Sequence, residues 1–143
     1  MTFLTTNSSL ESLDLSNCGL SSESMKLLFE ETLTNSQTRL KGLRISRNAL
    51  KSGGAIALSK YLETYDQLEC LEIKGCRIEK DGMLALIKSL LPSAKSGSLK
   101  ILEISDNNVL NEEAADALAT LIELATNLQV LDISDSNISE EEV

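Results

Sequence analysis

Acidic side chains recur at one place in a repeated phrase of the sequence, and they are the first candidates for chemistry. Residues 99–107 read LKILEISDN and residues 128–136 read LQVLDISDS, so Glu103 and Asp132 hold the same place, as does Glu72 in LECLEIKGC. Neighbouring carboxylates hydrolyse glycosides in retaining enzymes, where a deep sugar-binding cleft accompanies them. This chain has no Trp and no insertion that would form such a cleft. We therefore expect no catalytic role for these carboxylates.

The composition also argues against other common active sites. The chain contains no His, which excludes Ser-His and Cys-His nucleophiles and His-based metal sites within it. The pair Gly53 and Gly54 lacks the Gly-Lys-Ser/Thr of a phosphate loop, and no calcium-loop spacing is visible. Cys70 is expected to be an exposed thiol with no neighbour to activate it. We expect no enzyme, no cofactor and no metal.

Charge and cysteine usage limit the partner and the compartment. The formal net charge is -9, which disfavours a nucleic-acid partner because phosphate backbones would be repelled. Cys18, Cys70 and Cys76 are odd in number and follow no metal spacing, so we expect a reducing, cytoplasmic compartment. We see no apolar run long enough to span a bilayer and no secretory signal, so no membrane role is expected.

The phrase that carries these residues occurs five times, beginning at Leu10, Leu40, Leu68, Leu99 and Leu128. Each copy has apolar residues at its first, fourth, sixth and eleventh places. This pattern, LxxLxLxxN/CxL, resembles the leucine-rich repeat family, and the long spacing resembles its ribonuclease-inhibitor-like class. The resemblance implies one domain over residues 1–143, an α/β right-handed solenoid in a horseshoe arc, with parallel strands on its concave face and helices on its convex face.

The segments between the strands predict helices. A small residue is followed by Leu four residues later, which places both on one helical face: Ser24 and Leu28, Gly54 and Leu58, Gly82 and Leu86, Ala114 and Leu118. The fourth copy keeps this spacing only if Leu110 replaces Val109 as its eleventh residue, which implies a bulge in DNNVL. Helix starts are predicted at Ser21, Ser22, Asp81 and Asn111. The segment LPSAKSGS should end the third helix and form a loop.

Two sets of places are expected to be structural. The ninth residue should satisfy backbone groups inside the turn after each strand, and Cys18, Asn48, Cys76 and Asn107 hold this place. Ser136 departs from the pattern and suggests a looser or terminal coil. Leu102 and Leu131, at the fourth place, are expected to be buried strand residues, whereas Glu103 should be replaceable without loss of folding.

The charged places of the strands face the concave surface, where we expect a partner to bind. In the fifth place, Glu72, Glu103 and Asp132 would stack like charges on adjacent strands, which costs stability unless something offsets it. The candidate binding residues are Asp14, Arg44, Arg47, Glu72, Lys74, Glu103, Asp106, Asp132 and Asp135.

The second repeat makes this surface two-toned, because Arg39, Lys41, Arg44 and Arg47 are basic and the later repeats are acidic. A charge-patterned protein partner with a basic patch would complement it. The alternative is that the charges are simply solvated.

The resemblance leaves two functions open. The first is a non-catalytic protein-binding scaffold, similar to the solenoids of actin-regulating capping proteins and of large cytoskeletal or ciliary assemblies. The second is a GTPase activator acting on a small GTPase, because the closing stretch LDISDSNISEEEV resembles the last repeat of Ran GTPase-activating proteins. Neither end carries a recognisable solenoid cap, so we expect either a fragment of a longer solenoid or a neighbouring subunit that covers an end, the alternative being a natural small protein with frayed termini.

Overall fold

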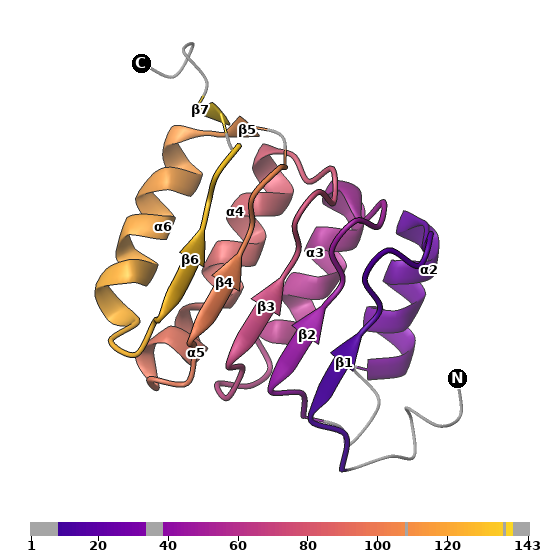
Figure 1. The fold of residues 1–143 in the computed structure, drawn as a ribbon, viewed down its shortest axis with the longest axis horizontal. Helices are drawn as coiled ribbons and strands as arrows, with labels where there is room; N and C mark the ends of the chain where they lie inside the picture. Colours follow the sequence, from indigo (N-terminus) through magenta and orange to yellow (C-terminus); the bar gives the residue numbers. More distant parts are fainter. Residues whose placement is uncertain (1–8, 34–38, 108, 136, 139–143) are drawn as a thin grey trace.

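Five parallel strands carry the repeated phrase and form one open sheet (Figure 1). The computed structural model describes residues 9–33, 39–107, 109–135 and 137–138. The sheet has the strand order β1-β2-β3-β4-β6. Its members are β1 (Ser12–Asp14), β2 (Gly42–Arg44), β3 (Cys70–Glu72), β4 (Ile101–Glu103) and β6 (Val130–Asp132). Sequence neighbours are therefore neighbours in space, as a stack of repeats requires.

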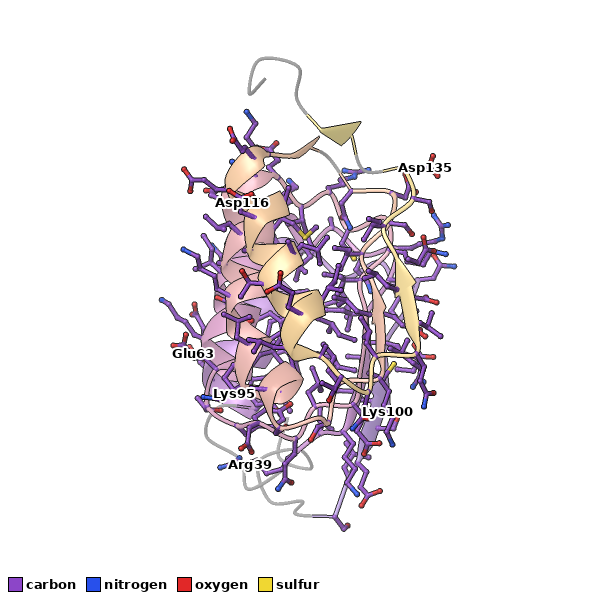
Figure 2. All side chains as sticks on the ribbon, turned by 90° about the vertical axis from the view of Figure 1, so that its left-hand side faces the viewer. Arg39, Glu63, Lys95, Lys100, Asp116 and Asp135 are labelled. Carbon is purple, nitrogen blue, oxygen red and sulfur yellow. The ribbon has the colours of Figure 1, made fainter. Side chains whose placement is uncertain are left out.

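Helices cover one face of this sheet and leave the other face open (Figures 1 and 2). They are α2 (Ser22–Leu27), continued by a π-helical turn over Leu28–Leu33, α3 (Lys51–Leu62), α4 (Lys80–Ser89), α5 (Leu91–Lys95) and α6 (Glu112–Leu124). A second, two-stranded sheet pairs β5 (Val109–Leu110) with β7 (Asn137–Ile138). This arrangement confirms the predicted α/β leucine-rich repeat solenoid, and the sheet does not close into a barrel.

The core lies between the sheet and the helices. The fourth and sixth places of the second to fourth repeats are buried there: Leu43, Leu71, Leu102, Ile45, Ile73 and Ile104. The prediction for Leu102 is therefore correct. Leu131 is only half-buried, contrary to expectation, because β6 is an edge strand with a neighbour on one side.

The small residue near the start of α4, Gly82, allows two neighbouring helices to approach closely. A Cβ atom at Gly82 would lie 2.9 Å from the Cα atom of Ser52 and 3.1 Å from the Cβ atom of Ala55, both on α3. Contacts this short leave no room for a methyl group beside the backbone of another helix. Gly82 therefore sets the distance between α3 and α4.

The helix ends follow the sequence signals in part. Ser21 and Asn111 are the N-caps of α2 and α6, and their side chains accept the N–H groups of Ser24 and Ala114. Asp81 lies inside the first turn of α4 and is not its cap. The segment LPSAKSGS is predicted to end the third helix and to form a loop. The helix α4 does end just before it, at Ser89, but the first five residues of the segment form α5, because Pro is compatible with the first turn of a helix.

The bulge predicted in DNNVL is confirmed by the strand registers. Ile101 on β4 pairs with Val130 on β6, 29 residues later, whereas Leu110 on β5 pairs with Ile138 on β7, 28 residues later, so the fourth repeat has one extra residue and Leu110 takes the eleventh place.

Candidate functional site

The turns that follow the strands are held by the ninth-place residues. The Asn107 side-chain oxygen accepts the N–H groups of Cys76 (2.9 Å) and Ile78 (3.3 Å), in the preceding repeat. Its amide group donates to the carbonyl oxygens of Ile73 (3.0 Å) and Ile104 (2.9 Å). Asn107 thereby satisfies backbone groups of two repeats at once, which fixes their spacing.

The other ninth-place residues differ in how many of these hydrogen bonds to the backbone they make. The Asn48 side chain bonds to backbone groups of the first repeat, including the N–H of Leu20 (3.0 Å) and the carbonyl of Leu15 (2.9 Å). The buried Cys76 thiol donates to the Ile45 carbonyl oxygen at 3.3 Å. Cys18 is exposed instead, because β1 is an edge strand. Ser136 lies outside the described residues.

The fifth-place residues form one column on the open face of the sheet, the face that carries no helix. Strand register pairs Asp14 with Arg44, Arg44 with Glu72, Glu72 with Glu103, and Glu103 with Asp132. Three carboxylates therefore do stand on adjacent strands. Something must reduce their repulsion, since adjacent strands are about 4.8 Å apart.

Cations from earlier repeats reduce it. The Arg44 Nε atom lies 3.2 Å from Glu72 Oε2, one strand further on. The Lys74 Nζ atom lies 3.3 Å from Asp132 Oδ2, two strands further on in the sheet. Of the three carboxylates on adjacent strands, Glu72 and Asp132 are therefore each paired with a cation. The pair of Lys74 with Asp132 joins repeats that are not adjacent, so a comparison of each repeat with the next one alone could not predict it.

A similar ion pair spans a repeat at the eighth place, where Arg47 Nη1 lies 3.7 Å from Asp106 Oδ2. Gly75 lies between them at φ +60°, and a Cβ atom there would be 3.3 Å from each of these two atoms. All five eighth-place residues have positive φ, and only the third repeat has Gly there. The missing side chain leaves the space that Arg47 uses to reach Asp106.

These pairs change the interpretation of the surface as two-toned. Lys41, Arg44 and Arg47 of the second repeat all lie beside carboxylates, and Lys41 Nζ is 3.4 Å from Glu11 Oε1. The second repeat is predicted to make one end of the surface positive, but each of these three charges is offset locally. What the open face offers to a partner is therefore mainly its remaining negative charge.

Glu103 carries that remaining charge at the middle of the acidic column. Its carboxylate has no hydrogen bond or ion pair to any of the residues that the structure describes. Asp132 is paired with Lys74, which is the seventh-place residue two repeats earlier. The equivalent residue two repeats before Glu103 is Ser46, which carries no charge.

Asp135 is also exposed and has no ion pair with the described residues. Asp106 pairs with Arg47, the eighth-place residue two repeats earlier, but the equivalent residue for Asp135 is Gly75, which has no charge.

Apolar side chains adjoin Glu103 on the open face. Ile101 and Val130 are register partners on β4 and β6, and each lies two residues before a carboxylate of the column. Val130 is 41% exposed, whereas Ile101 is half-buried. The part of the open face over β4 and β6 therefore combines an unpaired carboxylate with apolar surface.

Hydrogen bonds keep two carboxylates of the column ionised. The hydroxyl and backbone N–H of Ser134, with a smaller effect of Lys74, lower the pKa of Asp132 to about 2. The backbone N–H of Ser16 is the main cause that lowers the pKa of Asp14. Neither group resembles a proton donor of raised pKa, which acid catalysis near neutral pH requires.

The Cys70 thiol differs from its expected exposure. It is only 6% exposed, and burial raises its pKa, so it stays protonated and poorly nucleophilic. The described residues contain no group of three or more acidic, Cys or His side chains that could hold a metal. Within the same ranges, no helix has the length and apolar character needed to cross a bilayer.

Comparison with known proteins supports the repeat pattern itself. The family model described as Leucine Rich repeat matches two separate stretches, residues 6–29 and 68–86. These stretches contain the strands β1 and β3 and much of the helices that follow them. No curated protein matches the sequence.

Proposed function

We propose that this chain, a leucine-rich repeat protein, is a non-catalytic module that binds a protein partner through the open face of its sheet. Leucine-rich repeats generally mediate interactions between proteins, and the family is usually not enzymatic. The helix in every complete repeat favours the ribonuclease-inhibitor-like class. The three free cysteines are compatible with a cytoplasmic location.

The observation that carries the proposal is the unpaired Glu103 beside exposed Val130. Most charges of the open face are already balanced by ion pairs, so they contribute little free energy to a new contact. Glu103 is different, because a partner cation could pair with it without displacing one from this protein. Burying Val130 at the same time would add apolar contact, and complementary charge would orient the encounter.

The kind of partner follows from the residues of the face. Three of the nine predicted binding residues are basic and six are acidic, so the surface as a whole is negative. The best complement is a protein surface that places a Lys or Arg next to an apolar side chain. An acidic partner would meet repulsion from Glu103 and Asp135.

A charge reversal tests the proposal. Proteins captured from cell extract by the wild type would be identified, purified and titrated against the wild type, Glu103→Lys and Glu63→Lys. Glu63 is the matched control, because it lies on the helical side of the molecule (Figure 2). We expect Glu103→Lys to weaken binding by about tenfold or more and Glu63→Lys to leave it unchanged. Folding of Glu103→Lys should be intact, since the new cation would stand between two carboxylates.

Two results would contradict the proposal. If both variants bind like the wild type, the acidic column is merely solvated. If the captured protein is a small GTPase whose GTP hydrolysis the wild type accelerates, the chain is an activator of that enzyme and more than a binding module.

A further inference from the structure

Lys74 breaks the repeat pattern at the seventh place, directly after the buried sixth residue of β3. The other four repeats have Ser at this place: Ser16, Ser46, Ser105 and Ser134. Since these repeats form the same strand without a cation there, the fold does not require one. The backbone of Lys74 is held on both sides, because its N–H donates to Ser46 Oγ (3.0 Å) and its carbonyl accepts the N–H of Arg47 (2.8 Å). Its ammonium group is therefore an addition to the repeat that starts from a fixed point.

The carboxylate that Lys74 contacts has a donor at each of its acceptor positions. The Oδ1 atom of Asp132 accepts the backbone N–H (3.0 Å) and the hydroxyl (2.7 Å) of Ser134. The Oδ2 atom lies 3.3 Å from both the Ser105 hydroxyl oxygen and the Lys74 Nζ atom. An ionised carboxylate has about four lone-pair positions. With Lys74 in place, Asp132 therefore has no position left for a donor from another protein.

The neighbouring carboxylate of Glu103 is in the opposite state. Glu103 and Asp132 are register partners on β4 and β6, but Glu103 has no hydrogen bond or ion pair to the part of the chain that the structure describes. Adjacent strands are about 4.8 Å apart, so one guanidinium group, which has five N–H donors, could contact both carboxylates if both were free. Lys74 keeps one of them occupied.

The ion pair of Lys74 with Asp132 matters more for recognition than for stability. The two side chains are 36% and 28% exposed, and pairs this exposed contribute little to the free energy of folding. The effect on a ligand is larger, because the ammonium group fills an acceptor position and cancels one of the two negative charges. Removing it would change what the open face can bind without unfolding the chain.

We infer that Lys74 limits this part of the open face to one cationic contact, because it closes Asp132 to a partner and leaves only Glu103 free. This inference rests on the proposed function, since it concerns the same face, and it adds which basic group the face accepts. With Lys74 in place, Glu103 pairs with either a Lys or an Arg of the partner. Without the Lys74 charge, an Arg that bridges both carboxylates is preferred, because its planar group has more donors than the ammonium group of Lys.

The test uses two small probes that each carry one cation, Nα-acetyl-arginine methylamide and Nα-acetyl-lysine methylamide. Carbon-13 NMR would follow the side-chain carboxyl carbons of Glu103 and Asp132 as each probe is added to the full chain. The proteins are the wild type, Lys74→Met, Lys74→Arg and Lys60→Met. Lys60 is the control for net charge, because it is exposed on α3, on the helical side of the molecule.

In the wild type and in Lys60→Met, we expect both probes to shift the Glu103 carboxyl with similar affinity and to leave Asp132 unshifted. In Lys74→Met, the Arg probe should shift both carboxyls and bind about threefold or more tightly than the Lys probe. Lys74→Arg keeps the cation and should behave like the wild type. A loss of net charge alone would affect Lys60→Met and Lys74→Met equally.

Three results would overturn the inference. The first is an Asp132 carboxyl that responds to the Arg probe equally in the wild type and in Lys74→Met. The second is a preference for Arg over Lys that Lys74→Met leaves unchanged. The third is a large fall in the urea midpoint of Lys74→Met, since the pair would then serve the fold. The proposed function fails separately, because a captured protein that ignores Glu103→Lys would refute it whatever the probes show at Asp132.

Discussion

The repeat pattern places carboxylates on adjacent strands, and single basic and small residues offset the repulsion between them. Lys74 reaches Asp132 across the intervening strand, where the small Ser105 side chain leaves room and also donates to Asp132 (3.3 Å). Arg47 likewise reaches Asp106 over Gly75. A small residue in one repeat thus permits an ion pair between its two neighbours. Partially exposed pairs contribute little individually, but here they offset charges that the register forces together.

At the residue scale, we expect Asp132→Asn to remove a pH-dependent part of the free energy of unfolding. Hydrogen bonds from Ser134, with help from Lys74, lower the pKa of Asp132 from 3.8 to about 2 in the folded chain. A carboxyl with a lower pKa in the folded state stabilises the fold above its unfolded value, and this contribution is lost as the pH falls toward the folded value. The wild type and variant should therefore differ most above pH 3.8 and converge as the pH approaches about 2.

Urea unfolding of both proteins at a series of pH values measures this difference. Ser134→Ala is the companion variant, because it removes the hydroxyl bond of 2.7 Å but keeps the backbone N–H bond of 3.0 Å. It should show a smaller effect in the same pH range. A difference between wild type and Asp132→Asn that stays constant down to pH 2 would contradict the prediction.

At the scale of the element, a strand is stabilised by the neighbours on both of its sides. Leu102 on β4 is fully buried, whereas Leu131 on the edge strand β6 is only half-buried. We expect Leu102→Ala to lower the free energy of unfolding by about 2 to 5 kcal/mol. Leu131→Ala should cost about half as much or less, because part of its side chain already contacts water.

Denaturant titration of the two variants checks this difference, with Val130→Ala as a control on the open face of the same edge strand. The sequence pattern alone predicts equal losses, since both residues occupy the fourth place of a repeat. Equal losses would show that β6 is covered in solution. A small loss for Leu102→Ala would mean that the strand register is wrong.

At the scale of the whole molecule, the sequence predicts what is periodic and misses what breaks the period. The strand order, the column from Asp14 to Asp132 and the bonding of Asn48 and Asn107 to turn backbone all follow from repeating places, whereas the bonds of these two residues to the preceding repeat come from the structure. The burial of Cys70 and the helix α5 do not, because each depends on local packing or on a single Pro. The ion pair between Lys74 and Asp132 was missed because it joins repeats that are not adjacent.

The hydrogen bonds between repeats lead to a prediction for the solenoid as a whole. The sixth-place N–H groups of Leu15, Ile45, Ile73 and Ile104 each donate to the carbonyl of the fifth-place residue in the next repeat, at 2.8 to 2.9 Å. The corresponding N–H of Ile133 has no acceptor among the described residues. Since each repeat contacts mainly its neighbours, opening should begin at the ends and reach the middle last.

We therefore expect the backbone amides of Ile45 and Ile73 to exchange with deuterium slowest, and that of Ile133 to exchange close to the rate of an unprotected amide. Hydrogen exchange followed residue by residue by NMR would measure this order. If Ile133 were protected as strongly as Ile104, some segment would have to lie against β6 and accept its hydrogen bond. Dilution would then separate the two sources, because protection by a second copy falls with concentration, whereas protection by the chain itself does not.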